Sequence, residues 1–231
     1  MKIRIKFRKF GVMKFIGHLD VMRYFQKLLR RSDIPVAYTE GMSPHQIMSF
    51  AMPLGIGIES DAEYVDIEIT ERITSDIAIS RMNSNGVEGI EILSFRELPQ
   101  NSVNAMASIC AAQYDISFRD GYEPSFDCIK VLDSLYENPQ INVLKKTKKS
   151  EGIVDIKPGI LSYEGKDAHM HMCLSCGSAL NIKPELVLEA VYDHEGYKLE
   201  EYGLIIRRTE IFTNNAGELV SLDSIGADIN E

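Results

Sequence analysis

Two histidines and an aspartate near the N-terminus carry the side chains needed for acid–base chemistry. His18 and Asp20 open a predicted helix, where exposed N–H groups and the helix dipole favour an anion such as a phosphate. His45 follows Ser43 and Pro44 in a predicted loop, which the fold can bring toward that helix end. Two imidazoles beside a phosphate would supply the acid and the base of a metal-independent ribonuclease. The alternative is structural: His18 packs at a helix start, Asp20 caps it and His45 shapes a turn.

Positive charge is concentrated at the start of an otherwise acidic chain. Residues 1–31 contain ten basic residues and one acidic residue, so they carry +9, whereas the 231-residue chain carries −9. This imbalance favours a local docking surface for an anionic partner, with RNA as the first candidate. A solvated charged face is the alternative. Together with Asp20 and Ser43, the expected binding residues are Lys2, Arg4, Lys6, Arg8, Arg23, Arg30 and Arg31.

Two further features bear on RNA. Aromatic side chains near the basic segment stack on bases if they are exposed, although most are expected in the core. A lysine-rich stretch at residues 145–149 either adds a phosphate contact or forms an exposed hairpin tip. The aromatic residues are Phe7, Phe10, Phe15, Tyr24 and Phe25.

A pair of cysteines raises the question of a metal. Cys173 and Cys176 follow His169 and His171, and such residues can bind zinc. However, the chain has one such pair, and its strand-like alternation requires Cys176 to turn back toward the others. We therefore expect no metal and no cofactor, with zinc on these four residues as the alternative. Patterns for a radical SAM cluster, a Walker loop, a dinucleotide fingerprint and a nucleophile elbow are absent.

The sequence also predicts a location. Its N-terminus lacks the apolar stretch of a secretory signal, and the longest apolar run, residues 50–58, is too short to cross a membrane. We expect a cytoplasmic protein without membrane contact, whose cysteines are thiols or metal ligands rather than disulfides.

Hydrophobic periodicity predicts the elements that carry these residues. Residues 2–8 alternate like a strand, with Ile3, Ile5 and Phe7 inward and the basic residues outward. Residues 18–31 form an amphipathic helix. Its apolar stripe is expected to contain Leu19, Met22, Phe25 (or Gln26), Leu28 and Leu29. Further strands are predicted at residues 36–39, 47–52, 63–69 and 87–98, with a helix at 73–83.

The second half of the chain repeats this order of elements. Strands are predicted at residues 113–118, 141–146, 153–163, 169–175 and 204–212, and helices at 125–136 and 184–192. Each half is close to β-α-β-β-α-β, so we predict an α+β fold with two tandem ferredoxin-like domains. The expected domains are residues 1–100 and 101–215, followed by a loosely held acidic tail at 216–231.

Residues 14–69 resemble the radical-SAM-linked bacterial family, a domain of unknown function found alone or fused behind a radical SAM domain. Two positions depart from the family pattern: Met42 replaces a usual aromatic residue, and Gln46 a common proline. The cysteine pair is not part of that pattern, which counts against zinc. The matching motifs are His18-Leu19-Asp20, Arg23, Arg30-Arg31, Gly41-Met-Ser-Pro44-His45, Ser49–Leu54, Gly57-Ile-Glu59-Ser60, Glu63-Tyr64-Val-Asp66 and Asn181-Ile-Lys-Pro184.

The resemblance implies a stand-alone partner of a separate radical SAM protein with a link to RNA or ribosome metabolism, and no established activity. We therefore expect an RNA-binding or RNA-modification accessory protein. One alternative is an endoribonuclease using His18 and His45, since CRISPR RNA-processing endonucleases look similar at the level of tandem ferredoxin-like domains. The other is a protein-interaction adaptor whose cationic face meets an acidic patch on the radical SAM partner.

Overall fold

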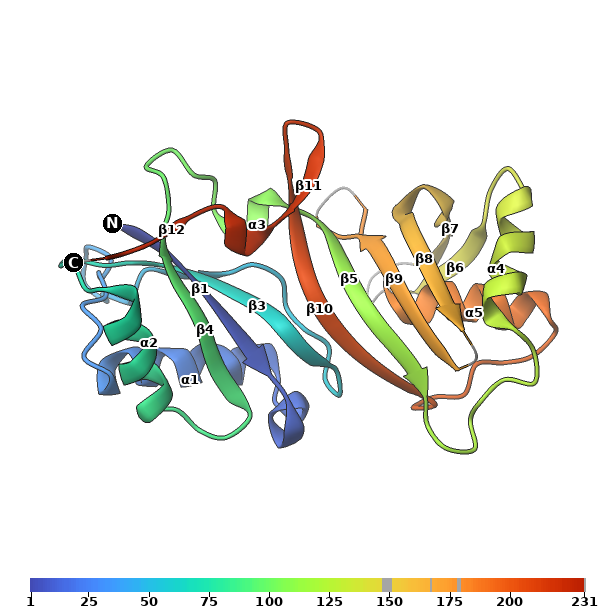
Figure 1. Cartoon of the computed structure of the whole chain (residues 1–231), viewed down its shortest axis with the longest axis horizontal. Helices are drawn as coiled ribbons and strands as arrows, with labels where there is room; N and C mark the ends of the chain where they lie inside the picture. The colour runs from blue at the N-terminus through green and yellow to red at the C-terminus, as the bar shows by residue number, and fades with distance from the viewer. Residues whose placement is uncertain (147–150, 167, 178–179, 231) are drawn as a thin grey trace. The chain divides into compact units, whose positions relative to one another are not determined.

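The chain folds as a mixed α+β protein. The computed structural model describes residues 1–146, 151–166, 168–177 and 180–230 (Figure 1). It divides into two compact units: unit 1 is Met1–Cys110 with Glu210–Glu231, and unit 2 is Ala111–Thr209. The first unit therefore includes the C-terminal segment that the sequence had suggested as a separate tail.

Unit 1 contains an antiparallel sheet and two packed helices. Its main elements are, in chain order, β1 (Lys2–Lys9), α1 (His18–Arg31), β2 (Met48–Phe50), β3 (Glu59–Glu68), α2 (Ser75–Ser84) and β4 (Ile90–Glu97). The short helix η1 (Gly11–Phe15) joins β1 to α1, and α3 (Ala105–Ser108) follows β4. In the sheet, β4, β1, β3 and β2 are neighbours in that order, and each pair is antiparallel.

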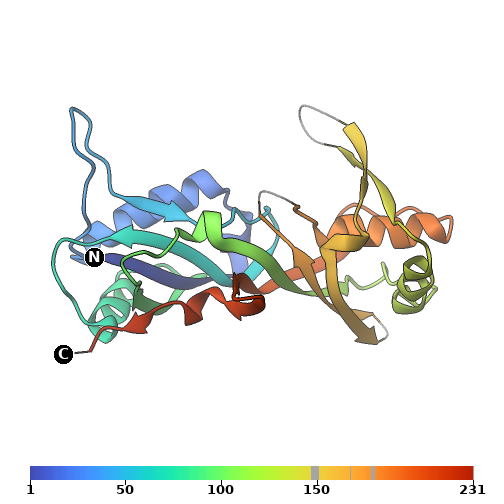
Figure 2. The same ribbon diagram turned by 90° about the horizontal axis from the view of Figure 1, so that it is seen from above.

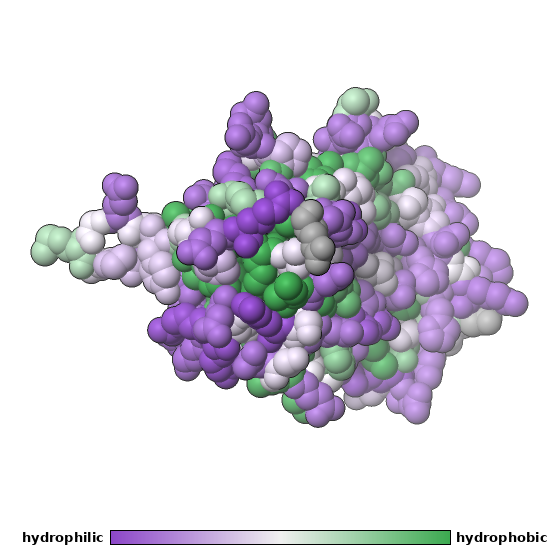
Figure 3. Space-filling model, turned by 60° about the vertical axis from the view of Figure 1, so that its left-hand side comes forward, coloured by the Kyte–Doolittle hydropathy of each residue, from purple (hydrophilic) through white to green (hydrophobic). Residues whose placement is uncertain are grey.

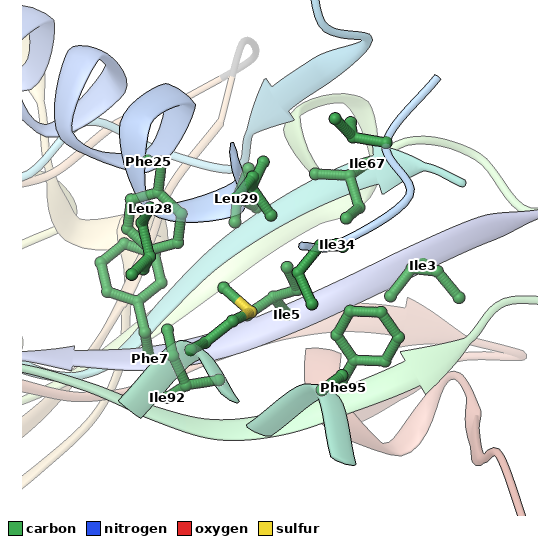
Figure 4. Close-up of a cluster of buried hydrophobic side chains, with 14 of the residues drawn as sticks. Ile3, Ile5, Phe7, Phe25, Leu28, Leu29, Ile34, Ile67, Ile92 and Phe95 are labelled. Carbon is green, nitrogen blue, oxygen red and sulfur yellow. The ribbon is translucent and has the colours of Figure 1, made fainter. Parts of the chain in front are cut away.

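One hydrophobic cluster holds unit 1 together (Figure 4). The inward residues of β1 are Ile3, Ile5 and Phe7, as their period-two spacing predicts, and each is at most 1% exposed. Phe7 meets Phe25 of α1, with ring centroids 4.5 Å apart. The helix stripe is partly different from the prediction, because Leu19 is 66% exposed. The buried residues of α1 are Val21, Phe25, Leu28 and Leu29.

Two predicted strands of unit 1 are much shorter than expected. Residues 36–39 form only isolated bridges, from Val36 to Ile69 and from Tyr38 to Gln46. The predicted strand at 47–52 is reduced to β2, which ends just before Pro53 and the glycines that follow. Between α1 and β3 the regular structure is therefore limited to the short strand β2 and these two bridges.

Unit 2 also combines antiparallel strands with two helices. Its sheet contains the first part of β10 (Leu204–Asn215), then β5 (Ile109–Phe118), β9 (His169–Ser175) and β8 (Ile160–Lys166) in that order. Its helices are α4 (Cys128–Glu137) and α5 (Pro184–His194), and β6 (Asn142–Lys146) pairs with β7 (Glu151–Asp155) as a separate hairpin.

The predicted strand at 153–163 is broken into two. A short helix, η2 (Lys157–Gly159), separates β7 from β8. Pro158 lies inside it, and proline lacks the N–H group that a continuous ladder needs. The residues predicted as one strand therefore form two strands: β7, which belongs to the hairpin, and β8, which lies at the edge of the sheet.

The C-terminal residues are not a loosely held tail, so that expectation is wrong. Strand β11 (Glu218–Ser221) pairs with the end of β10, and β12 (Ala227–Asp228) pairs with β4. Leu222, in η3 (Leu222–Ser224), is fully buried, and Ile229 is 2% exposed. Apolar burial and strand pairing thus tie this acidic segment to unit 1.

Candidate nucleic-acid interface

The cations of β1 face away from the apolar core, but they do not form an open basic surface. Arg4 is 2% exposed, so the expectation that it projects into solvent and binds an anion is wrong. Its Nε donates to Asp66 Oδ1 at 2.8 Å and its Nη2 to Asp66 Oδ2 at 3.0 Å. Its Nη1 donates to the Leu222 carbonyl at 3.3 Å, because the C-terminal segment covers this face of the strand.

The next two cations of β1 are also paired with acids. Lys6 Nζ lies 2.8 Å from Glu210 Oε2. The Tyr64 hydroxyl donates to the other oxygen of Glu210 at 2.6 Å, and burial, reinforced by the Glu210 charge, strongly raises the pKa of Tyr64. Arg8 bridges Asp61 at 2.8 Å and Glu91 at 3.1 Å. The charge excess of the N-terminal segment is therefore largely neutralised along β1.

Lys2, at the start of the strand, has a different environment. It is exposed, and its Nζ lies 3.5 Å from the Ser102 carbonyl. Lys14 of η1 is also paired with an acid, because its Nζ lies 3.2 Å from Glu59 Oε1. Lys2 is thus the one expected β1 contact that stays on the surface.

Helix α1 retains an exposed group of cations. Arg23, Lys27 and Arg30 follow one another at the i, i+4, i+7 spacing of a single helix face, and Arg31 lies beside them. We call these four residues the α1 cationic row. Arg23 makes a long contact of 3.4 Å with Asp20, and both side chains are more than 60% exposed, so this pair neutralises little. Lys27 was not among the expected binding residues, although its helical spacing could have identified it.

An exposed aromatic residue lies just before this row in the chain. Phe15 of η1 is 63% exposed, whereas Phe7 and Phe25 are buried in the core. Lys14 Nζ lies 5.5 Å from the Phe15 ring centroid. Of the five aromatics considered, Phe15 is therefore the one whose ring is best placed to stack on a base.

The structure does not bring His18 and His45 together. His18 is half-buried at the start of α1, with its ring edge-on to Phe50 at 5.3 Å. The backbone N–H of His45 donates to Thr39 Oγ1 at 3.1 Å, and the neighbouring Gln46 Nε2 donates to the Gln26 carbonyl at 3.3 Å. Gln26 is eight residues beyond His18, roughly 12 Å along the helix axis.

The segment that carries His45 belongs to the other end of α1. Figure 2 shows it projecting beyond the C-terminal end of the helix, and it stands out at the left of Figure 3. Ser43 is exposed in the same segment, while Asp20 stays in the first turn of the helix. A shared acid–base pair at the helix start, as expected from the sequence, is therefore not formed.

The cysteine and histidine pattern does not form a metal centre. His169, His171 and Cys173 alternate on one face of β9, as predicted, but Cys176 is buried at 5% exposure. Within the described part of the chain, no group of three or more histidine, cysteine or acidic side chains is arranged to hold a metal. In the structure none of the four cysteines forms a disulfide, and burial raises the pKa of Cys128 to about 11.

The lysine-rich stretch at residues 145–149 is described only in part. Lys145 Nζ donates to the Asn181 carbonyl at 2.8 Å, whereas residues 147–149 lie outside the described residues.

Over the described ranges, none of the helices has the length and apolar character needed to cross a bilayer.

Comparisons with known proteins place the chain in a family. None of the proteins with curated functions matches its sequence. A chain of the crystal structure of a Cbf5-Nop10-Gar1 complex is similar at 11% identity and a TM-score of 0.46, over 92% of this chain and 50% of that chain. This chain therefore spans about half the length of that one. A family model matches residues 2–184, so the protein belongs to the family described as an uncharacterized protein conserved in bacteria (DUF2344).

Proposed function

We propose that the protein binds RNA through the α1 cationic row, as an accessory to RNA modification. The observation that carries this proposal is the contrast between the two basic elements of unit 1. Arg4, Lys6 and Arg8 on β1 are held by acids, whereas Arg23, Lys27 and Arg30 point outward from α1. Cations without close acidic partners are those that gain most from meeting phosphates.

The shape of the row suits a short run of backbone phosphates. From Arg23 to Arg30 the helix rises roughly 10 Å, which is long enough to meet more than one phosphate. Arginine presents a planar fork of donors to phosphate oxygens, and lysine adds a mobile point charge. Phe15 offers a stacking platform at the N-terminal side of this helix, a combination typical of single-strand binding.

The proposal extends to the fold and to a partner. Unit 1 follows the chain order β-α-β-β-α-β with strands in the order β4-β1-β3-β2, and the sheet of unit 2 has the comparable order β10-β5-β9-β8. We propose that both are ferredoxin-like, with β6 and β7 as an insertion in the second. A separate radical SAM protein as partner is supported only by the motif resemblance in residues 14–69.

The test is RNA binding at several salt concentrations. The variant Arg23→Gln/Lys27→Gln/Arg30→Gln should weaken binding of single-stranded RNA about 100-fold and lower the salt slope by about 2, because counterion release scales with the phosphates contacted. The matched control is Arg81→Gln/Lys130→Gln/Lys198→Gln, which removes three exposed cations elsewhere. An absence of binding at low salt, or an equal loss in the control variant, would overturn the proposal.

A protein-docking role is the second candidate, and one observation favours it. Val12, Leu19 and Ile56 are each more than 60% exposed, and the Gly57 N–H donates to the Lys14 carbonyl, which brings the segment of Ile56 to η1. Exposed apolar residues of this kind mark protein interfaces. If a co-purifying protein survives RNase treatment and is released by Arg30→Glu/Arg31→Glu, the adaptor role is favoured over RNA.

A further inference from the structure

One face of the sheet in unit 2 carries an ordered set of polar side chains. Along β9, Met170, Met172 and Leu174 are buried, so His169, His171 and Cys173 lie on the opposite face. Along β5, Tyr114 and Ile116 are likewise buried, which places Gln113 and Asp115 on that face. The alternation of the two strands thus collects groups with acid, base and nucleophilic character.

The strand register aligns these groups in two rows. His171 lies opposite Asp115 of β5 on one side and Glu164 of β8 on the other. Cys173 lies in the next row, between Gln113 and Ser162. Residues two apart on a strand are separated by roughly 6.6 Å, so the imidazole and the thiol occupy neighbouring positions on one face.

Asp115 orients the histidine. His171 Nδ1 lies 2.6 Å from Asp115 Oδ1, a short charge-assisted contact. An ionised carboxylate only accepts hydrogen bonds, so His171 Nδ1 is the donor in this contact, and in the neutral imidazole Nε2 is then the acceptor. This is the arrangement in which an aspartate prepares a histidine to take a proton from a nucleophile.

The histidine and the thiol open into the same depression. A cavity of about 190 Å³ is lined by His171 and Cys173, together with Gln113, Ser162 and Glu164. Cys128 and Cys176 are buried, whereas Cys110 and Cys173 are both half-buried, and Cys110 Sγ donates to the Phe212 carbonyl at 3.6 Å. Of the two half-buried cysteines, Cys173 is the one that shares a strand face with His171.

We propose that Cys173 is a reactive thiol, activated by His171 and Asp115, that exchanges with small neutral or cationic disulfides. His171 Nε2 takes the Sγ proton, and the thiolate attacks one sulfur of the disulfide. The bond from Cys173 to that sulfur forms as the original S–S bond breaks. The leaving thiolate takes the proton from His171, so Cys173 is oxidised and the departing sulfur is reduced.

The charges around the cavity predict the substrate class. Asp115 on β5 and Glu164 on β8 flank His171, while His169 and Lys166 lie one row further along the same face. The two carboxylates beside the cavity repel an anionic disulfide and favour a cationic one. Cystamine should therefore react with Cys173 about tenfold faster than 5,5′-dithiobis(2-nitrobenzoate), after each rate is divided by its rate with free cysteine.

The experiment follows Cys173 labelling by peptide mass spectrometry in the full chain carrying Cys110→Ser. Wild-type Cys173 should react with iodoacetamide at pH 7 at least tenfold faster than the variants His171→Gln and Asp115→Asn. His169→Gln, on the same strand and face, should change the rate less than twofold. Equal rates in wild type and both variants would overturn the proposal.

A second measurement needs no substitution of the proposed residues. An unassisted thiol loses about tenfold in alkylation rate for each pH unit below its pKa, which is about 8.5 in a free cysteine. An imidazole-paired Cys173 should keep most of its rate between pH 8 and pH 6.5. A tenfold loss per pH unit across that range, or no difference between cationic and anionic disulfides, would contradict the proposal even if a variant failed to fold.

Discussion

Arg4 and Asp66 form a two-point ion pair inside unit 1, although 62 residues separate them in the chain. Their exposed fractions are 2% and 11%. Asp66 also accepts the Ala105 N–H at 2.7 Å, so its two oxygens are occupied by three donors. The pair connects β1 to β3 and to the start of α3, on the sheet face that the C-terminal segment covers.

Removing the acid of this pair should strongly destabilise the protein. Asp66→Ala leaves the Arg4 guanidinium buried without its counter-charge, which costs about 3–5 kcal/mol in comparable pairs. The measurement is the free energy of unfolding from urea denaturation. Asp20→Ala is the matched control, because it breaks the exposed contact with Arg23 and should cost less than about 1 kcal/mol. Similar losses in both variants would contradict the buried role of Arg4.

Gly89 should not tolerate a side chain. Its φ is +91°, and a Cβ would lie 2.6 Å from Met13 Cγ and 2.7 Å from the Phe10 carbonyl oxygen. Gly89→Ala should therefore cost more than about 2 kcal/mol, from backbone strain and from the clash with η1. Gly217 has a φ of +96° with open space around it, so Gly217→Ala should cost only about 1 kcal/mol. The thermal unfolding temperature of each variant is the measurement. The larger loss expected in Gly89→Ala gives the cost of the clash, because both variants carry the backbone strain.

The parts of unit 1 that follow local periodicity could be predicted from the sequence. Ile3, Ile5 and Phe7 are buried because a strand alternates its faces, and His18–Arg31 is a helix because its apolar residues recur at helical spacing. The pairing of Arg4 and Lys6 with acidic residues could not be predicted in this way. Their partners lie 62 and 204 residues away, and only the folded register brings them together.

The predictions of a loosely held C-terminal tail and of a paired His18 and His45 were wrong for a similar reason. Leu222 and Ile229 are isolated apolar residues in an acidic stretch, which gives no periodic signal. The position of His45 depends on Gln46 binding the Gln26 carbonyl, a contact that fixes the loop along α1. By contrast, the face shared by His171 and Cys173 was visible in the alternation of the strand, whereas the contact with Asp115 required the register.

The C-terminal segment should contribute to stability through its buried side chains. Leu222→Ala and Ile229→Ala each remove a side chain that is at most 2% exposed, and each should cost about 2–5 kcal/mol. Leu219→Ala is the control, because Leu219 is 43% exposed and should lose less than about 1 kcal/mol. Urea midpoints provide the measurement. Equal midpoints in all three variants would mean that the segment is not packed on unit 1.

Glu189 of α5 should lower stability at neutral pH. Burial, followed by the charges of Glu185 and Asp193, raises the pKa of Glu189 above its ordinary value of 4.5. The folded protein therefore holds this proton more tightly than the unfolded chain, and stability falls as the pH rises from 4.5 through the folded pKa. Above the folded pKa of Glu189 the whole loss of stability is present.

Glu189→Gln removes that loss and should stabilise the protein at pH 7 by about 0.2–0.5 kcal/mol, the size of like-charge pairs one helical turn apart. The gain should disappear at pH 4, where the carboxyl of the folded protein is already protonated. Glu137→Gln, an exposed change on α4, serves as the control for the loss of one negative charge. Unfolding midpoints at pH 4 and pH 7 decide the matter, because a gain of equal size at both values is incompatible with a raised pKa as its cause.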